Sequence, residues 1–148
     1  MEELIAEILK VLQTMKMVSA EGFVEAVIKR LEGIGYTVTS GDTWMLSFCI
    51  QKVNQHIINA CSTPTVPDGL FSIAADRVCG EFLFSLNQTG KLDIQSLDLD
   101  TAITQIHEGD TTIQFASGSS DSEKFTAFVN YLINEGDGDF VCYRKIKW

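Results

Sequence analysis

Proline and positive charge are both scarce in this sequence, and their scarcity narrows the possible functions. The 148 residues contain two prolines, and eleven Lys and Arg residues face twenty Asp and Glu residues, for a net charge of −9. A protein that binds duplex DNA of any sequence neutralises phosphates with Lys and Arg. The acidic balance therefore argues against general DNA binding. No apolar run reaches the length of a membrane-spanning helix, so we expect no membrane partner.

Recognisable catalytic and metal-binding motifs are also missing. No two cysteines stand at CxxC spacing, and the sequence lacks a glycine-rich phosphate loop, a GxSxG motif and an HExxH motif. Zinc would need ligands drawn from a scattered set: Cys49, Cys61, Cys79, Cys142, His56 and His107. We therefore expect no enzyme, no cofactor and no metal site.

The isolated polar residues fit structural roles better than chemical ones. His56 lies near the end of an apolar helical pattern, where a partly buried structural histidine is expected. The run NEGDGD lacks the ligand pattern of a calcium loop and reads as the end of a helix. The N-terminus opens with Glu2 and Glu3 instead of a basic leader, which favours a cytosolic, reduced and soluble chain.

Hydrophobic periodicity predicts a single domain that is mainly helical. Apolar residues recur at spacings of three and four, and small polar residues stand where helices should begin. The expected helices cover residues 2–16, 20–33, 43–61, 69–87 and 121–134, with Ser19, Asp42, Asp68 and Ser120 as N-caps. The prolines Pro64 and Pro67 should separate the third helix from the fourth.

Two of these helices carry unusual features. In the third helix, Trp44, Met45, Phe48 and Ile58 widen the apolar stripe, so we expect more than one of its sides to be covered. In the fourth helix, Gly80 stands in mid-helix at a cost of about 1 kcal/mol relative to alanine. Close approach of another helix would compensate for this cost, and a local kink is the competing explanation.

A change of period near residue 103 predicts a β-hairpin over residues 103–116. Ile103, Gln105 and His107 alternate with other residues, as do Ile113 and Phe115 beyond the turn Glu108-Gly109-Asp110. Period-two alternation around a glycine turn is typical of a hairpin. A lone hairpin is marginal in water, so this one should pack on the helices or on a neighbouring subunit.

The C-terminal segment combines apolar, aromatic and basic residues in an otherwise acidic chain. Aromatic residues and arginine are the types enriched at interface cores. The segment carries Phe140, Tyr143, Ile146 and Trp148, interleaved with Arg144, Lys145 and Lys147. We expect a helical domain over residues 1–136 and an extended docking tail over 137–148. The alternative is a last strand that folds back on its own domain.

The order of these features resembles a known family. The resemblance runs best from residue 33 to 148, and the first helix is less typical. It lies in GDTWMLSFCIQKVNQHIINAC, a proline-containing break with VPDGL, then RVCGEFL, IHEGDTTIQF and a closing YRKIKW. In this order they resemble the head–tail connector adaptors of long-tailed phages that infect Gram-positive bacteria.

The resemblance implies a structural subunit of the virion neck that assembles in the host cytoplasm. It implies a ring, a dodecamer in this family, between the portal protein and a tail-side neck protein (a stopper or terminator). The C-terminal tail would dock on the portal through Phe140, Tyr143, Arg144, Ile146 and Trp148. His107, Glu108, Gly109 and Asp110 would contact the next subunit or the tail, and DNA would pass through the channel without specific binding.

Two other readings remain open at this stage. The chain could be a different protein of the phage neck, a stopper or a tail terminator, although those proteins tend to be rich in β-structure. A reading from a different class is a small acidic protein-binding module, such as a toxin-neutralising immunity protein. Its composition and charge fit equally well, but such a monomer has no evident need for a basic, aromatic C-terminus. The fold expected in all cases is a bundle of four to five helices with one β-hairpin and an extended C-terminal tail.

Overall fold

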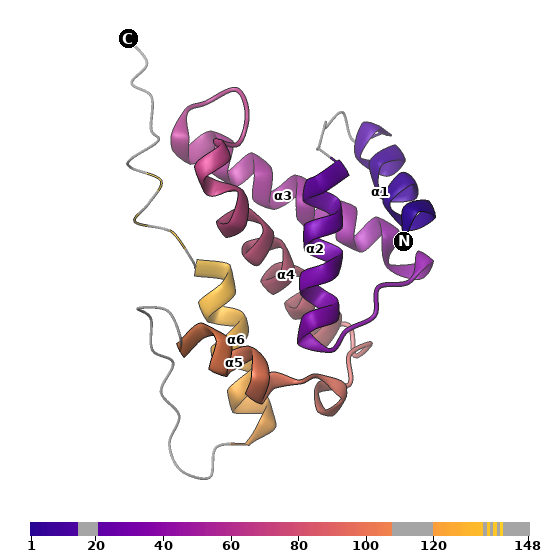
Figure 1. Cartoon of the computed structure of the whole chain (residues 1–148), viewed down its shortest axis with the longest axis vertical. Helices are drawn as coiled ribbons and strands as arrows, with labels where there is room; N and C mark the ends of the chain where they lie inside the picture. Colours follow the sequence, from indigo (N-terminus) through magenta and orange to yellow (C-terminus); the bar gives the residue numbers. More distant parts are fainter. Residues whose placement is uncertain (15–20, 108–119, 135, 137, 139, 141–148) are drawn as a thin grey trace.

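The described residues of this computed structural model form a helical bundle (Figure 1). They are residues 1–14, 21–107, 120–134, 136, 138 and 140. Within them there is no β-strand. The helices are α1 (Glu2–Thr14), α2 (Glu21–Ile34), α3 (Thr43–Cys61), α4 (Phe71–Gln88), α5 (Leu99–His107) and α6 (Asp121–Asn134), with short 3-10 helices η1 (Ser40–Asp42), η2 (Asp68–Leu70) and η3 (Ile94–Ser96).

Helix α4 lies at the centre of the bundle and packs against α2, α3 and α6 (Figure 1). Its sequence explains this position, because it is apolar around most of its circumference, as buried helices are. Val78, Cys79, Phe82 and Leu83 are fully buried, and Leu86 is almost fully so. Helix α1 packs on α3 and α2 at the edge of the bundle. Ile5, Ile8 and Leu12 of α1, at spacings of three and four, are buried in this contact.

The close-approach explanation for Gly80 is confirmed. A Cβ atom built at Gly80 would lie 2.8 Å from the Cβ of Leu132 and 3.1 Å from the backbone nitrogen of Ile133. Only a residue without a side chain lets α4 and α6 come this close. Gly136, just beyond α6, has a positive φ of 78° and makes a second close contact, with Ile73 of α4.

Glycine also ends α2. Gly35 has a φ of 108°, and its N–H donates to the carbonyl of Glu32 while the N–H of Tyr36 donates to that of Leu31. This pair of bonds is the Schellman motif, which satisfies two carbonyls at the end of a helix. The carbonyl of Ile34 accepts from the N–H of Asp98 at 2.7 Å. The segment before α5 is thereby fixed to the end of α2.

The predicted hairpin is wrong in its first arm. Residues 103–107 form the second half of α5, and its second arm and its turn lie outside the described residues. Leu99, Ala102 and Ile103 are buried at helical spacing, and α5 packs on α2 and α6. The alternation from Ile103 onward was misleading because it began in mid-helix. The burial of Leu99 and Ala102 imposes the helical period.

The predicted N-caps had mixed outcomes. Ser120 caps α6, since its hydroxyl accepts from the N–H of Glu123 at 3.2 Å. Asp42 precedes α3 but makes no cap bond to it. Its carboxylate instead accepts from the N–H and hydroxyl of Thr39 and from the hydroxyl of Tyr36. Asp68 begins η2 and also makes no cap to α4, while Ser19 lies outside the described residues.

Candidate interaction surface

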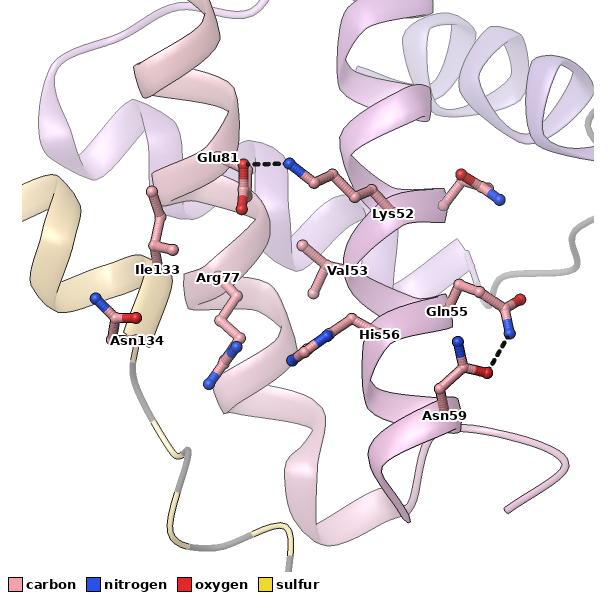
Figure 2. Close-up of a pocket in the computed structure, with 10 residues that line it drawn as sticks. Lys52, Val53, Gln55, His56, Asn59, Arg77, Glu81, Ile133 and Asn134 are labelled. Carbon is pink, nitrogen blue, oxygen red and sulfur yellow. Dashed lines mark hydrogen bonds and ion pairs between the residues drawn. The ribbon is translucent and has the colours of Figure 1, made fainter. Parts of the chain in front are cut away.

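A groove of about 640 Å³ lies between α3 and α4 and reaches the end of α6 (Figure 2). Most of the residues that line it have polar side chains. Lys52 of α3 and Glu81 of α4 form an ion pair across it, with 3.1 Å between Nζ and Oε2. Farther along, the side chains of His56 and Arg77 approach each other from α3 and α4. The amide of Gln55 donates to Asn59 at 2.9 Å along the outer side of α3.

Phe140 packs at the edge of this groove. Its ring centroid lies 4.7 Å from the Cζ of Arg77 and 6.0 Å from the centroid of the His56 ring. The thiol of Cys61 donates to the carbonyl oxygen of Phe140, with 3.8 Å between sulfur and oxygen. Phe140 is 6% exposed and Arg77 also 6%. The contact therefore places an aromatic face on a buried guanidinium, an arrangement in which the cation–π attraction is stronger than it is in water.

Helix α3 also exposes aromatic residues. Trp44 is 62% exposed and Phe48 is 58% exposed, and because they are four residues apart they share one face. Phe84 of α4 is 43% exposed. Two helices, α1 and α4, pack on α3, as the expectation of more than one covered side requires, but they leave Trp44 and Phe48 exposed. We call Trp44 and Phe48 the aromatic surface.

A buried ion pair lies on the other side of α4. The carboxylate of Asp76, whose residue is 4% exposed, pairs with the Nε of Arg30 on α2. Arg30 itself is half-exposed. A buried carboxylate needs such a partner, because transfer of an unpaired charge into a protein interior is costly. This pair fixes α2 against α4 and lies outside the groove.

The thiols of the described cysteines are buried and carry raised pKa values. Burial raises the pKa of Cys49 to about 11, and the nearby carboxylate of Glu81 adds to this effect. Burial also raises the pKa values of Cys61 and, together with Asp76, of Cys79. Because thiolates are the reactive form, these three groups are poor nucleophiles and behave as small apolar side chains.

The residues that the sequence predicts to make contacts lie in different places in the structure. Phe140, expected in the docking tail, instead packs inside the chain's own bundle. Tyr143, Arg144, Ile146 and Trp148 lie outside the described residues. His107 is the last residue of α5, and Glu108, Gly109 and Asp110 lie outside the described residues. His56, expected to be partly buried, is exposed and lines the groove.

The aromatic surface is the feature that sequence reasoning missed. The signal was present, because the apolar residues of α3 extend around the helix farther than one packed face requires. The two helices that pack on α3, α1 and α4, leave the face with Trp44 and Phe48 exposed. In the described part of the chain, no group of three His, Cys, Asp or Glu side chains is placed to hold a metal ion. No described helix has the length and apolar character needed to cross a membrane.

Comparison of the chain with protein-family models, with curated proteins and with solved structures finds no match.

Proposed function

We propose that this chain is a structural adaptor of the head–tail connector of a long-tailed phage or a phage-derived particle. The observation that carries the proposal is the aromatic surface beside the groove, at whose edge Phe140 fixes the start of the basic C-terminal segment. Large exposed aromatic side chains that gather on one face mark a site of protein association. The mechanism is assembly, and no chemical step is involved.

The helical architecture supports an adaptor over the other stations of a phage neck. The described residues contain six α-helices and no strand, whereas stoppers and tail terminators tend to be rich in β-structure. The net charge of −9 suits a ring through which DNA passes, because a wall of like charge does not hold the phosphates. A subunit that contacts its neighbour through two different faces closes into a ring when the rotation permits.

The tail that docks on the portal consists, in this proposal, of residues 141–148. Phe140 is reassigned from docking to anchoring, because its ring is buried against Arg77 and His56 of the same subunit. Tyr143, Arg144, Ile146 and Trp148 keep the portal contacts. They supply the aromatic and arginine side chains that dominate binding energy at interfaces.

The test is a chain that ends at Phe140, which keeps the anchor and removes the docking residues. We expect a folded subunit, with unchanged far-ultraviolet circular dichroism, that no longer binds portal-bearing heads. A second variant keeps the full length of the chain and removes only the positive charges of the tail. This triple change, Arg144→Gln, Lys145→Gln and Lys147→Gln, should weaken portal binding.

The matched control is the triple change Lys10→Gln, Lys29→Gln and Lys91→Gln, which removes the same charge from exposed positions elsewhere. It should bind portal as the unaltered chain does. Unchanged portal affinity in the shortened chain would remove the docking assignment and with it the adaptor function.

A further inference from the structure

The aromatic surface of α3 has an acidic group at its edge. Trp44 and Phe48 are the most exposed large apolar side chains of this helix, at 62% and 58%. The exposed carboxylate of Glu7 accepts a hydrogen bond, at 3.2 Å, from the hydroxyl of Thr43, the residue before Trp44. Lys52, one turn beyond Phe48, is held in an ion pair and adds no net charge. The surface therefore combines an exposed indole with an exposed carboxylate.

A second surface feature lies between α2 and α4. It is a hollow of about 300 Å³, which we call the α2–α4 hollow, and it is lined by Ala26, Lys29, Arg30, Phe71, Ser72 and Ala75. Phe71 is 41% exposed, although its ring makes an edge-to-face contact with Phe23, with 5.4 Å between the ring centroids. The hollow is at the lower end of the range of small-molecule pockets, roughly 300–1,000 Å³. It therefore has room for one large side chain.

The two cations at the α2–α4 hollow are accessible to a partner. The side chains of Lys29 and Arg30 are 62% and 53% exposed. Lys29 pairs with Glu25, and an exposed pair of this kind contributes little, so Lys29 can turn to another partner at small cost. Arg30 pairs with Asp76 through its Nε, whereas an aromatic ring stacks on the flat face of a guanidinium. The hollow thus offers an apolar wall beside cations, which are attracted to aromatic rings and to tryptophan most strongly.

The aromatic surface and the α2–α4 hollow cannot meet within one chain. Helices α3 and α4 pack against each other, and the chain turns back between them, so they run antiparallel (Figure 1). Lys52 of α3 pairs with Glu81 of α4. Trp44 lies eight residues before Lys52 and Ser72 lies nine residues before Glu81. At about 1.5 Å per residue these distances run in opposite directions and separate the two features by roughly 25 Å along the bundle.

We propose that the aromatic surface of one copy of this chain docks in the α2–α4 hollow of a second copy. The ring of Trp44 then packs on Phe71 and on the guanidinium of Arg30, and the acidic edge beside Thr43 meets the basic edge of the hollow. The contact is heterologous, because it joins unlike faces. Such contacts close into a ring where the rotation between copies allows it, and otherwise build open chains. For the closed ring, the inference rests on the proposed function.

The contact is too small to hold two copies together at low concentration. An aromatic side chain buries about 150–250 Å², so Trp44 and Phe48 supply roughly half of the ~800 Å² that each partner contributes to a standard interface. Association also costs translational and rotational freedom, which a small contact hardly offsets. The contact therefore forms where copies are held side by side at high effective concentration. In the proposed function, the portal holds them in this way.

The first measurement is the weight-average mass of the full chain by sedimentation equilibrium, over roughly 10 μM to 1 mM, where weak contacts form. We expect the mass to rise past that of a dimer, because each added copy still presents both faces. Trp44→Ala removes the indole, and Ser72→Glu places a carboxylate at the exposed edge of the hollow. Each variant alone should associate at least about tenfold more weakly. Far-ultraviolet circular dichroism checks that both keep the fold.

An equimolar mixture of the two variants distinguishes contact between unlike faces from contact between like faces. The Trp44→Ala chain keeps its hollow, and the Ser72→Glu chain keeps its aromatic surface, so the second docks on the first. The mixture should reach the mass of a dimer and stop there, because both faces that remain open on the pair are altered. If two aromatic surfaces joined each other instead, the Ser72→Glu chain would dimerise by itself.

Two control variants match these substitutions at other exposed positions. Phe84→Ala removes an exposed ring that is outside the aromatic surface, and Gln95→Glu adds the same charge outside the hollow. Both chains should associate as the unaltered chain does. This outcome attributes the effect of each test variant to its place on the surface and not to general loss of apolar area or gain of charge.

Three results would overturn the inference. They are a full chain that stays monomeric up to about 1 mM, a Ser72→Glu chain that associates like the unaltered one, and a mixture that forms no dimer. Portal binding is measured separately, with the chain that ends at Phe140. If that chain loses portal binding and the mixture forms no dimer, the adaptor function stands and this contact does not. If the mixture forms a dimer and portal affinity is unchanged, the contact stands and the function does not.

Discussion

Gly80 of α4 lies directly against Leu132 of α6, and the space between the two helices does not admit a side chain at residue 80. A Cβ atom there would lie 2.8 Å from the Cβ of Leu132, closer than such atoms approach in real structures. This contact holds α6 onto the central helix, and α6 leads to Phe140 at the edge of the groove.

Gly80→Ala is expected to destabilise the fold. Alanine favours helices by about 1 kcal/mol over glycine, but forcing an extra carbon into a packed interior costs about 1–3 kcal/mol. We expect a net loss of up to about 2 kcal/mol in the free energy of unfolding, measured with urea. Gly33→Ala is the control, because nothing lies within 4 Å of a Cβ at that position on α2. A stabilised Gly80→Ala variant would show that the helices can move apart freely.

Arg30→Met is expected to cost far more stability than Lys29→Met on the same helix. Arg30 pairs with the buried carboxylate of Asp76, whereas Lys29 pairs with the exposed carboxylate of Glu25 at 2.9 Å. Loss of Arg30 leaves a buried charge uncompensated, and because Arg30 is itself half-exposed we expect about 1–3 kcal/mol. The exposed pair should contribute less than about 0.5 kcal/mol. Equal effects in urea unfolding would contradict the assignment of Asp76 as a buried charge.

Phe140→Ala is expected to release the C-terminal end of the bundle. Removal of a buried phenylalanine costs about 3–5 kcal/mol in a core, and we expect about 2–4 kcal/mol here because the residue is near the chain end. Amide hydrogen exchange should accelerate in the last turns of α3, around Cys61. Phe84→Ala removes the same side chain from an exposed position and should change stability by less than about 1 kcal/mol. If both variants unfold alike, Phe140 is no anchor.

The buried thiols predict a loss of stability in alkali. The pKa of Cys49 is raised from an ordinary 9.0 to about 11, and burial raises those of Cys61 and Cys79 as well. Above pH 9 the unfolded chain loses these thiol protons while the folded chain keeps them, so unfolding is favoured as pH rises. Each such thiol should lower the free energy of unfolding by about 1.4 kcal/mol per pH unit, up to the pKa of its folded form.

Urea midpoints measured on either side of pH 9 check this expectation. Below the ordinary thiol pKa the midpoint should not change on account of these groups. Cys49→Ala should flatten the decline between pH 9 and about 11, the range that the raised pKa of Cys49 defines. The burial of Tyr36 and its hydrogen bond to Asp42 raise the pKa of its hydroxyl. Its contribution therefore remains in the Cys49→Ala variant. A slope that is the same with and without Cys49 would contradict the burial of this thiol.

Local patterns predicted most helices well, because their apolar spacing determines which face can be buried. The predicted range 43–61 of α3 and the range 121–134 of α6 match the structure at both ends. The prediction over residues 103–116 failed for a physical reason. The alternation covers only five residues, 103–107, and does not include Leu99 and Ala102. The burial of those two residues against neighbouring helices outweighs the local preference for a strand.

The caps show the same division between local and distant effects. Ser120 acts within three residues, and its cap on α6 follows from sequence alone. Asp42 had a competing partner in Tyr36, six residues earlier, and turns toward it and Thr39 instead of toward α3. Rules based on nearby residues do not predict that Tyr36 and Thr39 compete with α3 for the Asp42 carboxylate, because the outcome depends on the path of the chain into α3.

The sequence by itself determined the helical character, the main helix boundaries, the acidic balance and the aromatic, basic end of the chain. These depend on spacing and composition, which are local properties. The tertiary structure alone decided that Phe140 packs on Arg77, that Asp76 finds Arg30, and that Trp44 and Phe48 stay exposed. The reason is that burial depends on which helices are available to cover a face, and residues far apart in the sequence settle that.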